Sequence, residues 1–386
     1  MKTGWGVKKL GEVCEELFAG GDVPKKNSSK IETDKFNIPI FSNGEKNKGL
    51  YGYTNIARVT KPSITISARG TIGYSEVRKE PFYPAIRLIV VIPKTDILDL
   101  SFLKFVISSI DFTHSGSSIP QLTVPMIKGY PIPLPSITEQ QRIVTILDEV
   151  FAVISKAKAN AEQNLKNAKE LFESYLQSVF ENKGEGWEEK SLGEIADVEY
   201  GYTDKSTEEG GFRYVRITDI DKNGELISEY KKYIQYSKEA ENFLIQDNDL
   251  LMARTGATFA KVLLYKDYEP SVFASYLIRI KFKVNIENEL YWHFTKTKNY
   301  WGQANNLQSG AAQPHFNGAA VKQVIFSYPK SLEEQKALIQ KFKTLSIETK
   351  QLEAIYQQKI NDLDELKKSI LQKAFAGELN TTSVAA

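Results

Sequence analysis

The sequence predicts an α+β protein made of two copies of one unit, each a globular α/β domain followed by a long helix. Three observations carry this prediction. Motifs of the first half recur in the same order in the second half, β-rich runs lead each half, and each half closes on a long heptad-spaced stretch. A chain of 386 residues is long enough for two such domains and their connecting elements.

The repeat is traced by motif pairs whose offset grows steadily from 182 to 195 residues. The pairs are "WGVKKLGEVCE" from Trp5 with "WEEKSLGEIAD" from Trp187, "ISARGTIG" with "LMARTGAT", "GSSIPQLTV" with "GAAQPHFNG", Glu139-Gln140 with Glu334-Gln335, and "LFESYLQSVF" with "LKKSILQKAF". Because the order is kept and the offset only grows, one unit of about 190 residues is used twice with small insertions.

The front part of each unit, residues 1–135 and 184–330, is predicted to be a globular domain. Short β-rich runs such as "RLIVVIP" and "ASYLIRIKF" alternate there with "NG", "GG" and proline turns. These parts are interpreted as α+β domains with an irregular, twisted sheet. The glycine-rich "FAGGD" at residues 18–22 lacks dinucleotide-binding spacing and is interpreted as a turn.

The rear part of each unit, residues 136–183 and 331–378, is predicted to be a long helix, and residues 379–386 a flexible tail. Each helix opens on a proline or serine followed by the Glu-Gln pair, as in "PLPSITEQQ", and keeps a heptad rhythm for about five heptads. The residues predicted to pair the two helices are Leu147, Ile154, Asn164 and Leu171 in the first and Phe342, Leu352, Lys359 and Leu366 in the second.

The equivalent polar residues Asn164 and Lys359 are expected to fix the register and partner number of the helix pair. The alternative is that each helix only caps its own domain. Antiparallel pairing would relate the two units by an internal pseudo-twofold axis. At about 1.5 Å per residue, each helix would be a rod of about 60 to 65 Å that separates the two domains.

Composition and targeting signals indicate a soluble cytoplasmic protein. The N-terminus lacks the apolar core of a signal peptide, and no stretch approaches the roughly 18 apolar residues that span a membrane. The single cysteine, Cys14, allows no internal disulfide or thiolate metal cluster and is interpreted as a small half-buried hydrophobe.

Charge alone does not identify the partner of the chain. The net charge is +2, but residues 1–130 carry +6, residues 131–186 and 187–330 carry −2 each, and residues 331–386 are neutral. The first domain is therefore moderately basic, whereas the second would need its cations gathered on one face to attract phosphates.

In these duplicated motifs the whole chain resembles the specificity subunits of type I restriction-modification systems. The likeness rests on the two "W-x-x-x-x-LGE" openings, the "ARG" and "ART" turns, the "GSSIPQLT" and "GAAQPHFN" loops, the two helix entrances and the C-terminal "LKKSILQKAFAGEL". The resemblance implies two target-recognition domains, a non-catalytic subunit that reads a bipartite double-stranded DNA sequence, and paired helices that set the spacer.

The resemblance also implies two modification (methyltransferase) subunits and, through the complex, restriction subunits that translocate and cut DNA. S-adenosylmethionine, ATP and Mg are then expected in those partners, and no cofactor or metal in this chain. In agreement, the sequence has no Asn/Asp-Pro-Pro-Tyr/Phe stretch, no phosphate loop and no H-E-x-x-H motif. The three histidines, His114, His293 and His315, have no metal-ligand spacing.

Candidate DNA-binding residues are polar or aromatic side chains on the duplicated turns and loops. Those for the first half-site are Arg69, Thr71, Ser117, Ser118, Gln121 and Tyr53, and those for the second are Arg254, Thr255, Thr258, Gln313, His315 and Asn317. For the arginines the alternative is a structural ion pair or turn, and for the loops it is packing between a domain and its helix. Tyr51, Tyr200 and Tyr202 could line the same faces, or the core.

A second hypothesis for the whole chain is a duplicated coiled-coil scaffold that binds protein partners without recognising DNA. The weak net charge keeps this alternative open. A steep fall of DNA affinity with salt and a dependence on spacer length would separate the two hypotheses.

Overall fold

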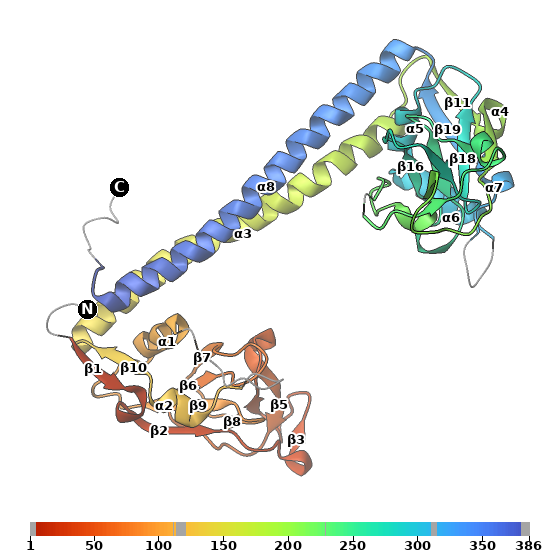
Figure 1. The fold of residues 1–386 in the computed structure, drawn as a ribbon. Coiled ribbons are helices and arrows are strands. Elements are labelled where there is room, and N and C mark those ends of the chain that lie inside the picture. The colour runs from red at the N-terminus through yellow and green to blue at the C-terminus, as the bar shows by residue number, and fades with distance from the viewer. Residues whose placement is uncertain (1–4, 111, 113–120, 228, 310–314, 380–386) are drawn as a thin grey trace. The chain divides into compact units, whose positions relative to one another are not determined.

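The computed structural model describes residues 5–110, 112, 121–227, 229–309 and 315–379. The chain forms two compact units: unit 1 is residues 1–161 with 358–386, and unit 2 is residues 162–357 (Figure 1). Both long helices, α3 (Ile137–Glu181) and α8 (Leu332–Ala376), have 45 residues, and each contributes one part to each unit.

In the part of unit 1 that the structure describes there are three sheets, two short α-helices and three 3-10 helices, in addition to its parts of α3 and α8. Its strands are β1 (Gly6–Lys9), β2 (Cys14–Ala19), β3 (Ser28–Ser29), β4 (Ile38–Phe41), β5 (Leu50–Thr54), β6 (Ser63–Ile66), β7 (Ser75–Arg78), β8 (Tyr83–Pro84), β9 (Ile89–Pro93) and β10 (Pro131–Leu134). Its helices are η1 (Leu10–Glu12), η2 (Lys25–Asn27), η3 (Lys46–Gly49), α1 (Leu100–Ser109) and α2 (Val124–Lys128).

Unit 2 has a corresponding set of elements. Its strands are β11 (Trp187–Ser191), β12 (Ala196–Tyr200), β13 (Phe212–Val215), β14 (Tyr233–Ile234), β15 (Leu250–Ala253), β16 (Val262–Leu264), β17 (Ser271–Phe273), β18 (Leu277–Phe282) and β19 (Ile325–Pro329). Its helices are α4 (Leu192–Ile195), η4 (Ile217–Asp219), η5 (Ala240–Phe243), η6 (Gly256–Thr258), α5 (Asn288–Phe294), α6 (Lys298–Leu307) and α7 (Gly318–Lys322).

The sheet topology confirms the predicted duplication and the α+β class. The antiparallel order β2-β9-β6-β7 of unit 1 corresponds to β12-β18-β15-β16 of unit 2, and the pair β1-β10 corresponds to β11-β19. The smaller sheets also correspond, because the parallel pair β4-β8 has its counterpart in β13-β17. Among the described residues, the predicted irregular sheet is three separate small sheets in each unit.

The central strands are continuous apolar runs because cores lie on both faces of the main sheet. In β9, Ile89 and Val91 enter the core that α1 and α3 cover, while Val90 and Ile92 enter a smaller cluster with Val59 and Phe82. Strand β15 alternates between two cores in the same way. The side-chain period of two thus divides one apolar strand between two cores.

The "LGE" motif that opens each unit is a structural turn. Leu10 is fully buried and donates its backbone N–H to Tyr130, and Glu12 accepts a hydrogen bond from the backbone of Lys9. Leu192 and Glu194 make the matching bonds in unit 2. The motif joins the first strand of each unit to the segment just before the long helix.

Each long helix is fixed to its domain by a fully buried glutamine of the Glu-Gln pair. Gln140 Nε2 donates to the carbonyls of Ile97 and Pro135, and its Oε1 accepts from Asp99, the N-cap of α1. Gln335 makes the equivalent three bonds in unit 2, to Asn285, Pro329 and Glu287. The serine three residues before each glutamate accepts from the backbone N–H of that glutamate.

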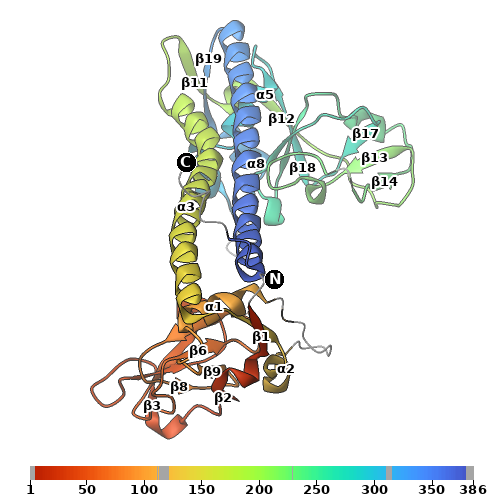
Figure 2. The ribbon, with the colours of Figure 1, turned by 90° about the vertical axis from the view of Figure 1, so that its left-hand side faces the viewer.

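Within each unit, α3 and α8 lie side by side and run antiparallel (Figures 1 and 2). In unit 1, Lys158 Nζ lies 2.6 Å from Asp364, and Lys367 lies over the ring of Phe151. The higher residue number on α8 thus contacts the lower residue number on α3, as antiparallel helices require. In unit 2, the rings of Tyr175 and Phe342 are 6.1 Å apart. The helices therefore pair, and the alternative that each helix only caps its own domain is wrong.

The end of one helix completes the core that the start of the other begins. Leu371 and Ala374, near the end of α8, are buried in the unit 1 core, beside Leu147 near the start of α3. Leu176 and Phe180, near the end of α3, are buried in the unit 2 core with Phe342. The twin C-terminal motifs "LFESYLQSVF" and "LKKSILQKAF" therefore have equivalent roles.

Of the residues predicted to pair the helices, Leu147, Ile154 and Phe342 are buried, whereas the other five are exposed. Leu171, Leu352 and Leu366 are 46%, 36% and 47% exposed, and Asn164 and Lys359 are also exposed. The buried or half-buried neighbours are Leu165, Phe172, Glu353 and Ile360.

The error has a geometric cause. Residues three and four positions after a buried residue lie on opposite sides of it on a helix, and at four of the five positions the prediction took the third where the fourth is the less exposed. At Leu366 this does not apply, because Lys367 is exposed as well. The seam position after Tyr356 is thus Ile360 rather than Lys359. The exposure of Asn164 and Lys359 gives no support to a role in fixing the register. A polar contact across the helices of unit 1 is made by Lys158 with Asp364.

Among the described residues, no helix has the length and apolar character that crossing a bilayer requires.

Candidate nucleic-acid interface

The predicted Arg69 turn of unit 1 joins β6 to β7. Gly70 and Gly73 have φ of +69° and +85°, a backbone region that favours glycine, and a Cβ at Gly73 would lie 2.9 Å from the ring of Phe112. The turn closes through a hydrogen bond from Ser67 to Tyr74. The half-buried Arg69 side chain leaves this turn, and Thr71 is exposed beside it.

The Arg69 turn is in contact with the loop that contains Gln121, the second segment from which candidate residues of this half-site were taken. Arg69 Nη2 and Nε donate to Gln121 Oε1 at 2.7 and 3.2 Å, and the backbone N–H of Leu122 donates to the carbonyl of Ala68. The arginine thus binds a neutral amide rather than a carboxylate. The predicted Ser117 and Ser118 lie outside the described residues. Tyr53 is half-buried in β5, opposite Ser29 and Pro39.

A second turn, which the sequence analysis missed, adjoins the first. Ile86 and Arg87, between β8 and β9, are exposed and have φ of +52° and +61°, which is strained for residues with a Cβ. Their N–H groups donate to the carbonyls of Gly21 and Gly20. Asn43 joins the two turns, because its amide donates to the carbonyl of Ile86 and accepts from the N–H of Ala68.

A basic hollow of about 870 Å³ lies beside the second turn of unit 1. It is lined by Ile86, Tyr51, Lys25, Lys26 and Lys30, with Asp22 as the acidic lining residue. Lys30 Nζ lies 3.5 Å from the centre of the Tyr51 ring. Three lysines and an aromatic ring next to exposed Arg87 form a surface suited to phosphates.

Unit 2 repeats the arrangement around Arg254. The carbonyl of Arg254 accepts from Phe316, and Thr255 and His315 form a β-bridge, so turn and loop again meet. The guanidinium of Arg254 lies 5.0 Å from the centre of the Tyr200 ring, and Nη1 donates to the carbonyl of Ser275 at 3.4 Å.

Two predicted residues of the second half-site have structural roles, and two others remain candidates. Thr255 is 3% exposed and pairs with His315 in a β-bridge, so its buried side chain is not available to contact DNA. Asn317 caps α7 by accepting from Ala320. Thr258 is half-buried in η6, and His315 is exposed. Gln313 lies outside the described residues.

The missed turn is also duplicated. Ser275 and Tyr276 correspond to Ile86 and Arg87: Ser275 donates to the carbonyl of Tyr202, and Leu277 donates to that of Ala274 as Leu88 does to that of Ala85. Tyr276 is exposed, and its carbonyl accepts from the N–H of Arg254. In both units, then, an arginine turn and a second turn lie together.

One sequence signal could have revealed the second turn. Gly20 and Gly201 pack so tightly against the strand end before this turn that a Cβ would lie 2.6 Å from the Pro84 carbonyl or 2.3 Å from the Ala274 carbonyl. The glycines of "FAGGD" and "EYGYTD" are thus required by close backbone approach. The two glycines follow the unit openings at nearly the same distance, since Gly20 comes 15 residues after Trp5 and Gly201 comes 14 residues after Trp187.

The two surfaces present groups that can read a duplex. Arg69, Gln121 and Arg87 in unit 1, and Arg254, His315 and Tyr276 in unit 2, offer hydrogen-bond donors, acceptors and an aromatic ring on turns. Within the described residues, no group of three His, Cys, Asp or Glu side chains is arranged as metal ligands.

Comparison with known proteins identifies the family. The profile of the type I restriction modification DNA specificity domain matches residues 2–167 and 184–362. The specificity subunit of type I restriction enzyme StySPI of Salmonella potsdam is 24% identical over 297 residues, which are 72% of this chain and 63% of that protein. A Mycoplasma pneumoniae protein described as a type I specificity subunit, S.MpnORF89P, is 34% identical over 172 residues, 45% of this chain and 51% of the relative.

Two solved structures have a similar fold. A chain from a study of complex assembly and conformational transition of the type I R-M system has a TM-score of 0.74 at 16% identity, with 98% of this chain and 99% of that chain covered. The HsdS subunit from Thermoanaerobacter tengcongensis has a TM-score of 0.64 at 18% identity, with 98% of each chain covered.

The chain spans about half the length of the Mycoplasma pneumoniae relatives that it matches. The family profile, by contrast, matches most of the chain in two segments, one for each copy of the duplicated sequence unit. The protein therefore belongs to the family of type I restriction-modification DNA specificity subunits.

Proposed function

We propose that this chain recognises a bipartite duplex DNA sequence, with one half-site read by each unit. The observation that carries the proposal is the duplicated pairing of an arginine turn with a second exposed turn, whose backbone hydrogen bonds match in the two units. The side-chain link between the turns differs, because Asn43 supplies it in unit 1 and Arg254 itself in unit 2. Two copies of one surface suit two half-sites of one duplex. In unit 1 the basic hollow would hold the backbone while Arg69, Gln121 and Arg87 face base edges.

The paired helices are proposed to set the spacer between the half-sites. Each helix is 45 residues long and continues from one unit into the other, so its length links the two readers. The chain itself is proposed to be non-catalytic and to carry no cofactor. Its activity would be to direct adenine methylation and ATP-dependent cleavage by other subunits in the cytoplasm.

Two modification subunits are the proposed partners of the helices, with restriction subunits joining through the complex. Leu171 and Leu366 occupy equivalent positions 195 residues apart and are both largely exposed. Val153, Ile347 and Ile355 add exposed apolar surface to the same helices. Apolar side chains in these numbers on helix surfaces favour protein contacts, and equivalent leucines favour two equivalent contacts. S-adenosylmethionine, ATP and Mg would be bound by those partners.

The test begins with the target, obtained by mapping methylated adenines in the host genome. The complex with the modification subunit is then titrated with a duplex that carries the target. The logarithm of the affinity should fall steeply with the logarithm of the salt concentration, and a changed spacer should abolish specific binding. Binding that is insensitive to salt and spacer would favour the protein scaffold and contradict the proposal.

The units serve as controls for each other. Arg69→Gln and Arg87→Gln should each reduce discrimination at one half-site by about tenfold, or about 1.4 kcal/mol, which lies within the roughly 1–3 kcal/mol expected per base contact. Arg254→Gln and Tyr276→Ala should do so at the other half-site. Loss of discrimination at both half-sites from one substitution, or at neither, would contradict the assignment of one half-site to each unit.

A further inference from the structure

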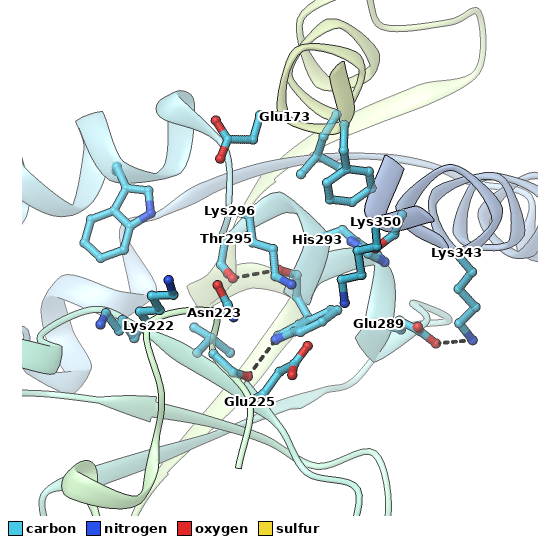
Figure 3. A pocket seen from close by; sticks show the side chains of 18 of the residues that line it. Glu173, Lys222, Asn223, Glu225, Glu289, His293, Thr295, Lys296, Lys343 and Lys350 are labelled. Carbon is cyan, nitrogen blue, oxygen red and sulfur yellow. Dashed lines mark hydrogen bonds and ion pairs between the residues drawn. The ribbon is translucent and has the colours of Figure 1, made fainter. Parts of the chain in front are cut away.

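Unit 2 contains a pocket of about 590 Å³ that is separate from the turns described above (Figure 3). One wall is formed by Phe172 and Leu176 of α3, a second by the segment from Lys343 to Lys350 of α8, and a third by the end of α5 with Trp292 and His293. The turn at residues 222–225 and the start of β16 close it. Its volume lies within the range of small-molecule sites.

The pocket has an excess of positive charge without internal partners. Lys343 is paired with Glu289 at 2.8 Å, and Figure 3 shows it directed toward that carboxylate. The four other lining lysines form no ion pair with any described residue. Two lining glutamates also form no ion pair with any described residue. These are Lys222, Lys261, Lys296 and Lys350, with Glu173 and Glu225. The unpaired lining groups therefore carry a net positive charge.

One of these groups, Lys296, is held close to an aromatic ring. Lys296 Nζ lies 3.1 Å from the centre of the Trp292 ring, and the indole N–H of Trp292 donates to the carbonyl of Gly224. Burial is the main cause that lowers the pKa of Lys296 to about 8, and the charge of nearby Lys350 adds to it, while Glu225, Asp221 and Glu289 act in the opposite direction. An anion between these two ammonium groups would relieve their repulsion.

The unpartnered ring nitrogens of His293 point to a ligand. Its side chain lines the pocket and is 4% exposed, yet neither ring nitrogen has a hydrogen-bond partner among the described residues. Its ring centre is 4.8 Å from that of Phe342 and 5.0 Å from that of Trp292, so apolar contacts alone hold it. A buried imidazole without partners costs free energy, which a ligand that accepts its N–H would recover.

We propose that this pocket binds a small organic phosphate of nucleotide size. Lysine ammonium groups bind phosphate as point charges, and His293 supplies a neutral N–H donor. Phe172, Trp292 and Trp301 offer apolar and aromatic surface for a flat ring system. This binding activity goes beyond DNA recognition and does not depend on it.

The experiment titrates the full chain with AMP, ATP, adenosine and inorganic phosphate, without DNA, by calorimetry and tryptophan fluorescence. AMP or ATP should bind at one site per chain, and adenosine and inorganic phosphate should bind at least about tenfold more weakly, because each engages only part of the pocket. Lys296→Gln and Lys350→Gln should each weaken nucleotide binding about tenfold, the loss expected for one hydrogen bond to a charged group.

Two variants separate a binding role from a structural one. His293→Phe keeps an aromatic ring against Phe342 and should weaken binding while the protein stays at least as stable to heat. Lys341→Gln, on α8 beside the ring of Tyr175 and outside the pocket, should leave binding unchanged.

Three results would overturn the proposal. The first is that none of the four probes binds, and the second is that binding is equal in wild type, Lys296→Gln and His293→Phe. The third is that the pocket variants weaken assembly with the modification subunit, or DNA affinity, while no nucleotide binds. The occupant would then be an acidic side chain of the partner or the DNA backbone.

Discussion

Gln140 and Gln335 each make three hydrogen bonds that join the start of a long helix to its own domain. Both side chains are fully buried, so truncation leaves two carbonyls and an N–H without partners. Gln140→Ala should therefore lower the free energy of unfolding by about 2–4 kcal/mol. Gln141→Ala, the exposed neighbour, should change it by less than about 0.5 kcal/mol. Urea denaturation checks both, and equal effects would contradict the structural role.

His293 gives unit 2 a predictable pH dependence. Burial, with Lys296 and Lys343 nearby, lowers its pKa from 6.5 to about 3. The unfolded chain therefore takes up a proton between these values that the folded chain does not, and stability falls as the pH decreases through this window. The slope is at most about 1.4 kcal/mol per pH unit.

His293→Phe removes this contribution. Between pH 7 and pH 5, the variant should lose about 2 kcal/mol less of its unfolding free energy than the wild type does. The measurement is urea denaturation at both pH values. Parallel stability curves for the two proteins would show that His293 is not held neutral in the folded state.

At the scale of elements, substitutions in α8 can show which of its positions form the seam with α3. Ile360 is 9% exposed and Lys359 is exposed. Ile360→Ala should lower the free energy of unfolding by about 2 kcal/mol, since it removes a buried side chain. Lys359→Ala should change it by less than about 0.5 kcal/mol. Thermal denaturation distinguishes the two, and the reverse order would restore Lys359 to the seam.

At the scale of the whole molecule, the end of the chain belongs to the first unit. Residues 358–386 contribute Leu371 and Ala374 to the core of unit 1. Truncation after Gln357 should make residues 5–110 sensitive to limited proteolysis, because their core loses its cover. Truncation after Leu379 should leave the digestion pattern unchanged. Equal resistance of both truncated chains would contradict this dependence.

The length of the paired helices should set the length of the DNA spacer that is recognised. One heptad inserted after Ala161 and another after Gln357, at the boundary between the units in both helices, keeps the seam within each unit. Seven helical residues add about 10 Å, or about three base pairs, to the spacer that is recognised. Insertion in one helix only should abolish recognition. Selection from a library of spacer lengths measures the change, and an unaltered preference would contradict a spacing role for the helices.

The sequence by itself determined the duplication, the α+β class, the family and the course of both long helices. Each of these depends on local signals that recur in order: a capped helix entrance, an uninterrupted apolar period, and turns rich in glycine and proline. The "LGE" and Glu-Gln motifs were visible as repeats for the same reason, although their roles as a structural turn and a buried anchor were not.

Only the tertiary structure decided which helix positions are buried, and which surfaces form a site. A helical repeat allows the next seam residue to follow after either three or four positions. The choice between Lys359 and Ile360 therefore depends on how α8 packs against the elements around it. The Arg87 turn, the bond from Arg69 to Gln121, and the orphan nitrogens of His293 all arise from contacts between segments far apart in the chain. A linear pattern does not encode those contacts, because side-chain environment is set by packing between elements rather than by local sequence.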